Sequence, residues 1–436
     1  MPNTGMRIAV IGAGVAGMAS ACELALQGHQ VTVYDRHDGV AEAASFAHAN
    51  LLTPGLVTPA AAPGLRRWLW RGLRHHNAAL RWHPLQSSDA YRWLWRWWRA
   101  SRRGHVDDVR AMTELALLSA RRQETIGQTL SVETERSAGV LVLLRHASEL
   151  APTHRHAQML RDMGWSAREL SPEQCREVEP HLGAGTLAGG LHLPDDAVGN
   201  CRLWIQRLRD ALVRKRGLQL QLGTEVRAIR SAESGRGIAL HLTPRAGSRQ
   251  HRDVDGQHSG RIDRHDAAVL CGGADTGLLA EVGVRIPLMP VWGQSLTLRL
   301  RPDSLALQSA VIDARAGVTL TRLGERLRVT GGYTLGPRGA NTSEAALRPL
   351  YGALDRWFGH ATERASPLIW QGARPMLPDG PPIIGAAPMT GVWLNVGHGA
   401  HGWTLACGGA RLLAEQIAGA TPSLDPVPFA LARWQT

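Results

Sequence analysis

The sequence predicts a mixed α/β protein in which a parallel sheet with covering helices is interleaved with an antiparallel sheet. Residues 7–35 follow the order strand, glycine-rich turn, helix and strand, which is the repeating unit of parallel sheets. Residues 288–300, 317–323 and 326–333 instead alternate apolar and polar side chains, as the strands of an antiparallel meander do. A chain of 436 residues is long enough for two such domains.

The N-terminal unit consists of an apolar strand at 7–11, a glycine motif at 12–17, a helical pattern that ends near Gly28, and a strand at 30–34 followed by Asp35. Gly12 permits a tight turn, Gly14 lets the backbone approach a pyrophosphate, and Gly17 lets the helix pack on the strand. The helix N-terminus directs N–H groups at the phosphates. The Asp35 carboxylate can accept hydrogen bonds from a ribose diol. The unit therefore predicts a Rossmann-type domain with a bound dinucleotide, FAD or NAD, rather than an ordinary glycine-rich turn.

The remainder of the chain favours FAD. An NAD dehydrogenase usually continues with consecutive βαβ units, whereas this chain leaves that pattern after Asp35. Later segments with nucleotide-binding character are an edge strand at 223–229, an apolar strand at 267–273, and a glycine motif at 397–404 that leads into a helix at 405–417. That helix would place a second N-terminus at the cofactor, where N–H groups stabilise the negative charge of a reduced flavin. The structural alternative is a glycine loop that caps a surface helix.

The composition is basic but does not by itself identify a partner. The formal net charge of +12 is typical of proteins that bind nucleic acid, membranes or acidic substrates. Lys215 is the only lysine, so the charge comes from arginine, which biased codon usage also produces. The five scattered cysteines form no Cys-x-x-Cys pair, so we expect a reducing cytoplasm, no disulfide framework and no metal site. An apolar stretch after Arg7 resembles a secretory signal, but cleavage there would remove the glycine motif, so we do not predict a signal peptide. No run of apolar residues is long enough to predict a transmembrane helix.

Several further motifs carry a family resemblance: 44–47, 53–55, 62–64, 290–297, 312–313, 320–324, 372–380, 382–385 and 397–407. With the N-terminal unit, they resemble the bacterial D-amino acid dehydrogenases of the D-amino acid oxidase and glycine oxidase superfamily, over nearly the whole chain. The resemblance implies a glutathione-reductase-like FAD/NAD(P)-binding domain interleaved with an antiparallel-sheet substrate domain. We expect the first from residues 1–88, 193–285 and 366–436, and the second from residues 89–192 and 286–365.

The resemblance also implies the reaction. Hydride passes from the substrate Cα to flavin N5, and the resulting imino acid is hydrolysed to a 2-oxo acid and ammonia, with electrons going to a quinone or another acceptor. Arg374 aligns with the carboxylate-binding arginine of the oxidase relatives, and an arginine fork suits a carboxylate. Tyr333 is a second candidate for contact with the substrate, with core packing as its alternative role. Competing functions are the oxidation of glycine, sarcosine or a D-proline derivative, and a flavin-binding subunit without turnover.

The residues expected to contact the cofactor are Gly12, Gly14, Gly17, Asp35, Arg36, Ser45, His48, Val226, Gly272, Gly399, Gly402, Trp403 and Thr404. One of them departs from the family pattern, which typically has Asn where this chain has His48. His48 could replace an asparagine hydrogen bond, alter the flavin potential, or tether the flavin covalently.

Residues 68–103 concentrate tryptophan and arginine. Tryptophan favours the lipid headgroup boundary and arginine favours anionic lipids, which would suit an enzyme at the inner face of the cytoplasmic membrane. The alternative is a set of helices whose tryptophans pack inward while the arginines remain solvated. Single-stranded nucleic acid also binds such residues, but a complete dinucleotide site argues against it.

Overall fold

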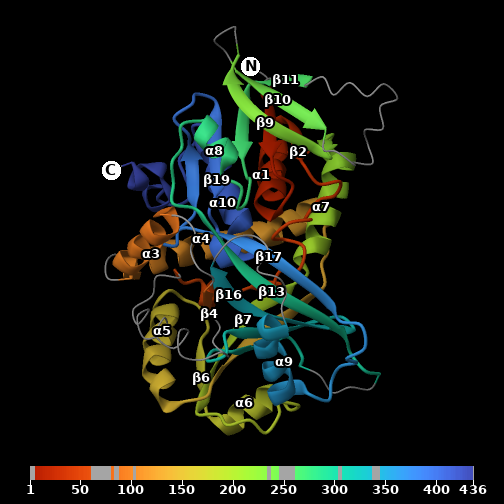
Figure 1. The fold of residues 1–436 in the computed structure, drawn as a ribbon, viewed down its shortest axis with the longest axis vertical. Helices are drawn as coiled ribbons and strands as arrows, with labels where there is room; N and C mark the ends of the chain where they lie inside the picture. Colours follow the sequence, from red (N-terminus) through yellow and green to blue (C-terminus); the bar gives the residue numbers. More distant parts are fainter. Residues whose placement is uncertain are drawn as a thin grey trace.

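The structure is a computed structural model that describes residues 5–59, 80–82, 88–101, 105–232, 237–244, 261–302, 307–335 and 344–435. Figure 1 shows two halves stacked along the long axis of the molecule, each built around its own sheet. The chain passes between the halves several times, so each half draws on segments that are far apart in the sequence. The predicted mixed α/β fold is confirmed.

The upper half in Figure 1 holds a six-stranded sheet. Its strands, in spatial order, are β18 (Ile383–Ala386), β19 (Val392–Val396), β12 (Ala267–Leu270), β1 (Arg7–Ile11), β2 (Gln30–Asp35) and β8 (Gln219–Leu222). All neighbours are parallel except β18 and β19. The predicted strands at 7–11, 30–34 and 267–273 thus lie side by side at the centre of this sheet, because each is apolar enough to be buried on both faces.

Helices cover one face of this sheet and a second, small sheet covers the other. The helices are α1 (Val15–Leu26), α4 (His105–Leu130), α7 (Cys201–Arg216) and α10 (Gly402–Ile417), and their buried faces form the largest apolar cluster of the described residues. The small sheet consists of β9 (Thr224–Ser231), β10 (Ile238–Pro244) and β11 (Arg261–His265), and it packs on β1 and β12. β9 lies at its edge, as the sequence predicted for residues 223–229.

The lower half holds a ten-stranded sheet. Its main spatial order is β17 (Leu368–Met376), β13 (Met289–Arg299), β16 (Arg326–Leu335), β15 (Val318–Leu323), β14 (Ala310–Asp313), β5 (Arg136–Leu144), β7 (Gly189–Gly199) and β3 (Leu51–Leu52), with β4 (Leu80–Trp82) beside β16 and β6 (Arg168–Leu170) beside β7. The predicted meander strands are confirmed as β13, β15 and β16. All neighbours are antiparallel except β14 with β5 and β16 with β4.

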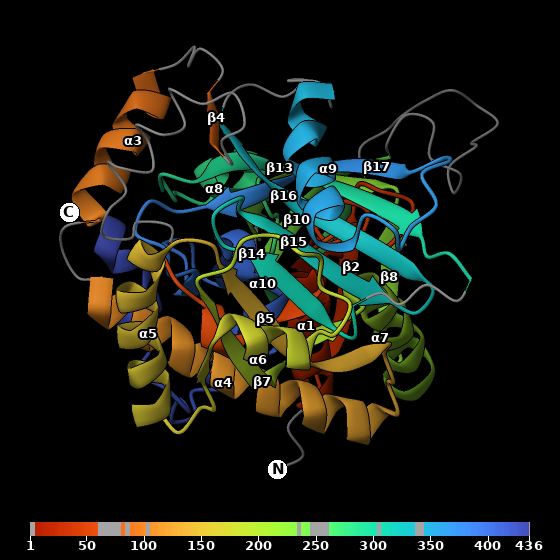
Figure 2. The ribbon, with the colours of Figure 1, turned by 90° about the horizontal axis from the view of Figure 1, so that it is seen from below.

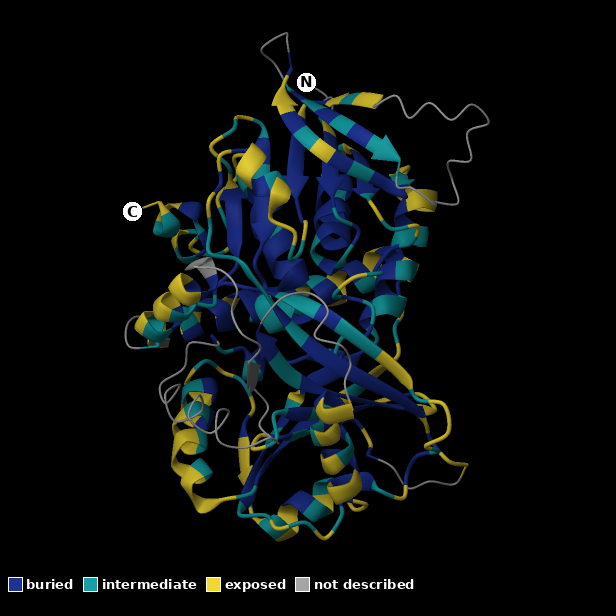
Figure 3. Ribbon diagram, in the orientation of Figure 1, coloured by how far each residue is buried: buried dark blue, intermediate teal, exposed yellow. Residues whose placement is uncertain are grey.

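The outer helices of the lower half are α5 (Leu150–Asp162), α6 (Pro172–Val178) and α9 (Glu344–Phe358). α9 packs on β13, β15 and β16, and α6 packs on β5, β6 and β7, as the view from below in Figure 2 also shows. Leu296, Leu320, Leu350 and Trp357 belong to the apolar cluster that this packing buries. Figure 3 shows that the sheets of both halves are mostly buried, while the outer turns of α5, α6 and α9 remain exposed.

The two halves divide the chain differently from the expected domain bounds at three elements. The division expected at residue 193 falls inside β7, which runs as one strand of the ten-stranded sheet. Helix α4 lies within the segment expected for the substrate domain, yet Met112 and Leu115 pack in the cluster of α1 and α10. β17 lies within the segment expected for the FAD domain, yet it pairs with β13 in the ten-stranded sheet. Pairing between distant strands decides the place of β7 and β17, and packing against α1 and α10 decides that of α4; local sequence pattern encodes neither.

Two observations bear on membranes and metals. Among the residues that the structure describes, no helix combines the length and apolar character needed to cross a bilayer. Within the same residues, no three side chains of His, Cys, Asp or Glu are grouped so that they could hold a metal ion.

Candidate active site

A cavity of about 730 Å³ lies at the junction of the two halves and extends from the N-terminal glycine motif to the ten-stranded sheet. Its volume falls in the range of about 300–1,000 Å³ that is typical of ligand and cofactor sites. The candidate residues that line it are Gly12, Gly14, Asp35, Arg36, Ser45, His48, Val226, Gly272, Tyr333, Arg374, Gly399, Gly402, Trp403 and Thr404. Gly17 does not line the cavity. The structure thus brings together residues that are as many as 392 positions apart, from Gly12 to Thr404.

The glycine motif forms one end of the cavity, and two of its glycines leave no room for a side chain. Gly12 has φ of +113°, and a Cβ atom on it would lie 2.4 Å from the carbonyl oxygen of Cys271. A Cβ atom on Gly17 would lie 1.8 Å from the carbonyl oxygen of Gly12, so Gly17 lets the helix pack closely against the turn. Gly14 caps α1, and the Ser45 hydroxyl accepts a hydrogen bond of 3.1 Å from the N–H of Val15. This is the backbone cradle that a pyrophosphate needs.

Asp35 is held rigidly beside this cradle. Its Oδ2 atom accepts a hydrogen bond of 2.7 Å from the N–H of Ala13, and its Oδ1 atom accepts one of 2.8 Å from the N–H of His37. The Oδ1 atom also lies 2.8 Å from the Nδ1 atom of the His37 ring, so Oδ2 is the oxygen that can accept a further bond from a ribose hydroxyl. The neighbouring Arg36 donates to Asp275 over 2.8 Å, and both side chains are close to half exposed. Together with the glycine cradle, this geometry fits the adenosine diphosphate part of a dinucleotide.

The glycine motif at 397–404 also lines the cavity, and a Cβ atom on Gly402 would lie 3.9 Å from the Val15 side chain at the start of α1. Helix α10 begins at Gly402, three residues before the predicted start, because the 3₁₀ turn at 399–401 leads directly into it. The Trp403 indole is buried and donates to the carbonyl oxygen of Gly199 over 2.9 Å, and the Thr404 hydroxyl donates to that of Leu51 over 3.1 Å. These two side chains therefore anchor the start of α10, where Gly402 lines the cavity. A helix N-terminus in this position suits the negative end of a reduced flavin.

Arg374 and Tyr333 lie together at the end of the cavity formed by the ten-stranded sheet. The Arg374 Nη1 atom donates to the carbonyl oxygen of Gly332 over 2.8 Å, and its Cζ atom lies 4.7 Å from the centre of the Tyr333 ring. The two residues come from β17 and β16, which are separated by β13. On β13, Gly293 leaves the space that the guanidinium fills, because a Cβ atom there would lie 2.4 Å from Arg374 Nη2. Sequence reasoning did not single out Gly293, although a glycine within a strand pattern often marks such a close approach.

The rest of this end is apolar or neutral. Its lining from the lower half includes Leu51, Leu56, Val142, Ile312, Trp370, Gln294, Thr319 and Thr330. The Trp370 ring stacks on Phe46 at 6.0 Å between centres. Among the described lining residues, the carboxylates are Asp35, Glu225 and Asp275, all on the segments that form the nucleotide end. Arg374 is therefore placed in a region of low polarity, where a single charge acts strongly on an anionic ligand.

Three histidines complete the cavity wall: His398 is buried, and His48 and His401 are half-buried. Burial lowers the pKa of His48, His398 and His401 to about 4, so all three rings are neutral near pH 7. The His48 Nδ1 atom accepts a hydrogen bond of 3.0 Å from the N–H of Asn50, and its Nε2 atom lies 3.3 Å from the carbonyl oxygen of Ala400. Both ring nitrogens of His48 are thus engaged by the protein.

The tryptophan- and arginine-rich segment is described in part, since residues 60–79, 83–87 and 102–104 lie outside the described residues. Helix α3 (Ser88–Ala100) is amphipathic. Trp93 and Trp97 are buried beside Met376, and the Trp93 indole donates to the carbonyl oxygen of Met376 over 3.3 Å. Tyr91 and Trp95 are instead 61% and 54% exposed. The helix therefore packs Trp93 and Trp97 inward, as one of the two sequence interpretations predicted, and leaves Tyr91 and Trp95 exposed.

Comparison with known proteins agrees with this geometry. A model of the family described as FAD dependent oxidoreductase (DAO) matches residues 7–416. A D-amino acid dehydrogenase of Chromohalobacter salexigens is 32% identical over 434 residues, which cover 98% of this chain and 100% of the relative. A D-amino acid dehydrogenase of a Methylobacterium species is 35% identical over 445 residues, which cover 99% of this chain and 99% of the relative.

Solved structures show the same fold. Glycine oxidase from Geobacillus kaustophilus superposes with a TM-score of 0.74 at 23% identity, covering 98% of this chain and 99% of that one. L-proline dehydrogenase from P. horikoshii gives a TM-score of 0.70 at 17% identity, covering 99% of this chain and 98% of that one. The predicted choice of FAD over NAD is confirmed by the matching family. The family model and the relatives show that the chain belongs to the DAO family of FAD-dependent oxidoreductases, in agreement with the glycine cradle and the cavity.

Proposed function

We propose that this protein oxidatively deaminates D-amino acids to 2-oxo acids and ammonia. The observation that carries the proposal is Arg374, a guanidinium at the end of the cavity opposite the nucleotide cradle, fixed by Gly332 and the Tyr333 ring. Its planar fork matches a carboxylate, and the neutral surroundings strengthen that pairing. The relatives that share about a third of the sequence are D-amino acid dehydrogenases, which supports the D configuration of the substrate.

The reaction would proceed as follows. FAD, when bound, supplies the two-electron acceptor: hydride leaves the substrate Cα, the amine becomes an imine, and water hydrolyses the imine to a 2-oxo acid and ammonia. Arg374 would bind the substrate carboxylate and so fix the direction in which Cα–H points. The Tyr333 hydroxyl would donate a further hydrogen bond to the substrate. The apolar walls around Leu56 and Ile312 would exclude water while the imine forms.

The same cavity supports assignments for the cofactor-holding residues. Gly12, Gly14 and the N-terminus of α1 would hold the pyrophosphate, with Gly17 and Ser45 fixing the turn and the helix start. Asp35 would bind the adenosine ribose. Other contacts along the cofactor would come from Arg36, Val226 and Gly272 on the nucleotide side, and from His48, Gly399, Gly402, Trp403 and Thr404 on the ring side.

A panel of substrates tests the reaction. The purified holoprotein is mixed anaerobically with D-amino acids, L-amino acids, glycine and sarcosine, and the visible flavin absorbance is followed. Bleaching by D-amino acids that is lost in Arg374→Ala, and retained in a surface control such as Arg364→Ala, supports the proposal. Bleaching by sarcosine or glycine alone would transfer the assignment to secondary or unsubstituted amines, and an unreduced flavin with every amine would refute it.

We further propose a quinone as the electron acceptor and the outer face of α3 as a contact with anionic lipid. Tyr91 and Trp95 are exposed on this face next to arginines, and Arg99 lies 5.4 Å from the Trp95 ring. Aromatic rings beside arginine suit the headgroup region of an anionic membrane. In co-sedimentation with vesicles that contain phosphatidylglycerol, Trp95→Ser should weaken binding. Leu368→Ser, which alters another exposed apolar residue, should not. Equal binding of all three proteins would exclude α3 as the contact.

A further inference from the structure

Two segments that are about 350 residues apart in the sequence meet across the wall of the cavity. His48 contacts the carbonyl oxygen of Ala400, at a sequence separation of 352 residues. In the opposite direction, His401 contacts the carbonyl oxygen of Thr58 over 3.1 Å, at a separation of 343 residues. Each segment thus contributes one imidazole and one carbonyl oxygen, so the two contacts form a reciprocal pair, which we call the histidine bridges.

We propose that His48 and His401 are positioning residues that lock segment 48–58 to the start of α10, and that His48 holds the cofactor site in place without a covalent bond to the cofactor. This inference rests on the proposed cofactor site. His48, the histidine that departs from the family pattern, would thus hold two stretches of backbone together.

The contacts of His48 determine its tautomer. The N–H of Asn50 can only donate, so the Nδ1 atom that receives it carries a lone pair. The proton of the neutral ring must therefore be on Nε2, which faces the Ala400 oxygen as a donor. Asn50 itself is fixed, since it is buried with φ of +62° and its side-chain oxygen accepts a hydrogen bond of 3.1 Å from the N–H of Cys201. A covalent tether needs a free ring nitrogen, and neither nitrogen of His48 is free.

A buried arginine extends the His48 bridge into the ten-stranded sheet. Arg328 on β16 is 7% exposed, and its Nη1 atom donates to the carbonyl oxygen of His48 over 3.2 Å. Its Nε atom donates to the Thr297 hydroxyl on β13 over 3.0 Å. A continuous chain of hydrogen bonds therefore runs from β13 through Arg328 and His48 to Ala400. The substrate sheet and the start of α10 cannot move apart without breaking it.

The bridge also fixes one peptide group at the start of α10. The Ala400 carbonyl oxygen is held by His48, and the N–H on the other side of the same peptide bond, that of His401, donates to the His398 carbonyl oxygen over 3.1 Å. Both ends of this peptide are thus engaged, so its orientation is set before any ligand arrives. This turn fixes the start of α10 that follows it, and N–H groups held in place before a ligand binds stabilise negative charge without reorganisation.

The neutral state of the bridges agrees with this role. Arg374 lowers the pKa of both His48 and His401, although burial is the larger cause for each. A second cation at this end would compete with Arg374 for the substrate carboxylate. Neutral donors hold the segments together without adding charge.

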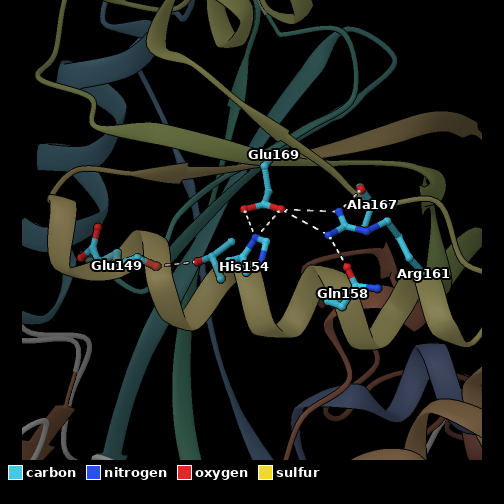
Figure 4. Close-up of polar contacts among 7 residues, drawn as sticks. Glu149, His154, Gln158, Arg161, Ala167 and Glu169 are labelled. Atoms are coloured by element: carbon cyan, nitrogen blue, oxygen red, sulfur yellow. Dashed lines mark hydrogen bonds and ion pairs between the residues drawn. The ribbon is translucent and has the colours of Figure 1, made fainter.

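The test follows flavin release and does not depend on turnover. Holoprotein is diluted and the increase in flavin fluorescence is recorded for wild type, His48→Asn, His48→Leu and His401→Leu. The leucine variants should release flavin roughly tenfold faster or more, since His401→Leu loses one hydrogen bond and His48→Leu loses two. His48→Asn, whose amide can still donate, should fall between them and wild type. The matched control is His154→Leu, because His154 is mostly exposed on α5, pairs with Glu169 (Figure 4) and does not line the cavity.

The outcomes separate this inference from the proposed function. Acid precipitation of the wild-type protein should leave all flavin in the supernatant. The non-covalent role would be overturned if flavin stayed on the precipitated wild-type protein but not on precipitated His48→Leu. Release from the His48 variants at the wild-type rate would overturn the positioning role. If His48→Leu does not fold by circular dichroism, the comparison of His48→Asn with wild type decides. A wild-type protein that holds no FAD would instead refute the cofactor site, whatever the variants do.

Discussion

Gly293→Ala should abolish most of the activity while leaving Arg374 and its charge in place. The added Cβ atom would lie 2.4 Å from Arg374 Nη2, 2.6 Å from Cζ and 2.7 Å from Nη1. Ordinary contact needs about 3.4 Å or more, so the guanidinium must move by roughly 1 Å and give up its bond to Gly332. The guanidinium is the far end of a flexible side chain, so it moves while the β13 backbone stays. A misplacement of about 1 Å can cost a factor of about 100 in rate, which is about 2.7 kcal/mol of transition-state stabilisation.

The assay is stopped-flow reduction of the flavin by a D-amino acid under anaerobic conditions, at a series of substrate concentrations. We expect a loss of about 100-fold in the second-order rate constant, with flavin content and thermal stability close to wild type. Gly352→Ala is the matched control, because a Cβ atom at Gly352 in α9 meets nothing within 4 Å. It should keep full activity and gain a few tenths to about 1 kcal/mol of stability. Wild-type reduction rates in Gly293→Ala would refute Arg374 as the carboxylate anchor.

Three further predictions concern the cofactor cradle, helix α3 and a buried acid. Gly17→Ala should yield protein without bound flavin, measured by absorbance, because its Cβ atom would lie 1.8 Å from the backbone oxygen of Gly12, which cannot move cheaply. Trp93→Ala should lower the free energy of unfolding by about 3–5 kcal/mol in urea titrations, since it removes a buried indole bonded to Met376; a loss below 1 kcal/mol would contradict that packing. Burial raises the pKa of the Asp196 carboxyl group to about 7. Between about pH 4 and pH 7 the folded state therefore keeps a proton that the unfolded state has lost. The free energy of unfolding should fall as the pH rises through this range. Asp196→Asn should flatten that fall in thermal denaturation at pH 5 and pH 8, and an unchanged slope would show that other groups cause it.

The local part of the fold could be predicted well. The unit at 7–35 is encoded by neighbouring residues, since strand, turn, helix and strand contact one another directly, and the structure has them at almost the predicted bounds. β13, β15 and β16 also lie close to their predicted bounds, although most of their residues are buried on both faces of the sheet. FAD and the family could also be predicted, because the motifs that carry them are short and contiguous.

The relative placement of distant segments could not be predicted. Nothing near Arg374 in the sequence indicates that Gly293 faces it, because that contact depends on the register between β17 and β13. The position of α4 against α1 and α10 depends on which apolar faces remain uncovered once both sheets form. The histidine bridges depend on the same long-range assembly. Whether Tyr333 and the residues along the cavity contact their ligands as assigned remains a prediction.

The central position of β1 has a consequence for how the protein is made. β1 is the first strand to leave the ribosome, yet one of its two neighbours is β12, whose pairing begins at Ala267, and the next strand, β19, begins at Val392. At about 5–20 residues per second, translation takes on the order of twenty seconds or more to reach these partners. The apolar edge of β1 must be shielded from other chains during that time. The cofactor cradle, which needs Cys271 behind Gly12 and the start of α10 beside Val15, cannot be complete before synthesis is almost finished. Capture of FAD should therefore be a late event, and truncation near the C-terminus should yield an aggregation-prone apoprotein rather than a smaller enzyme.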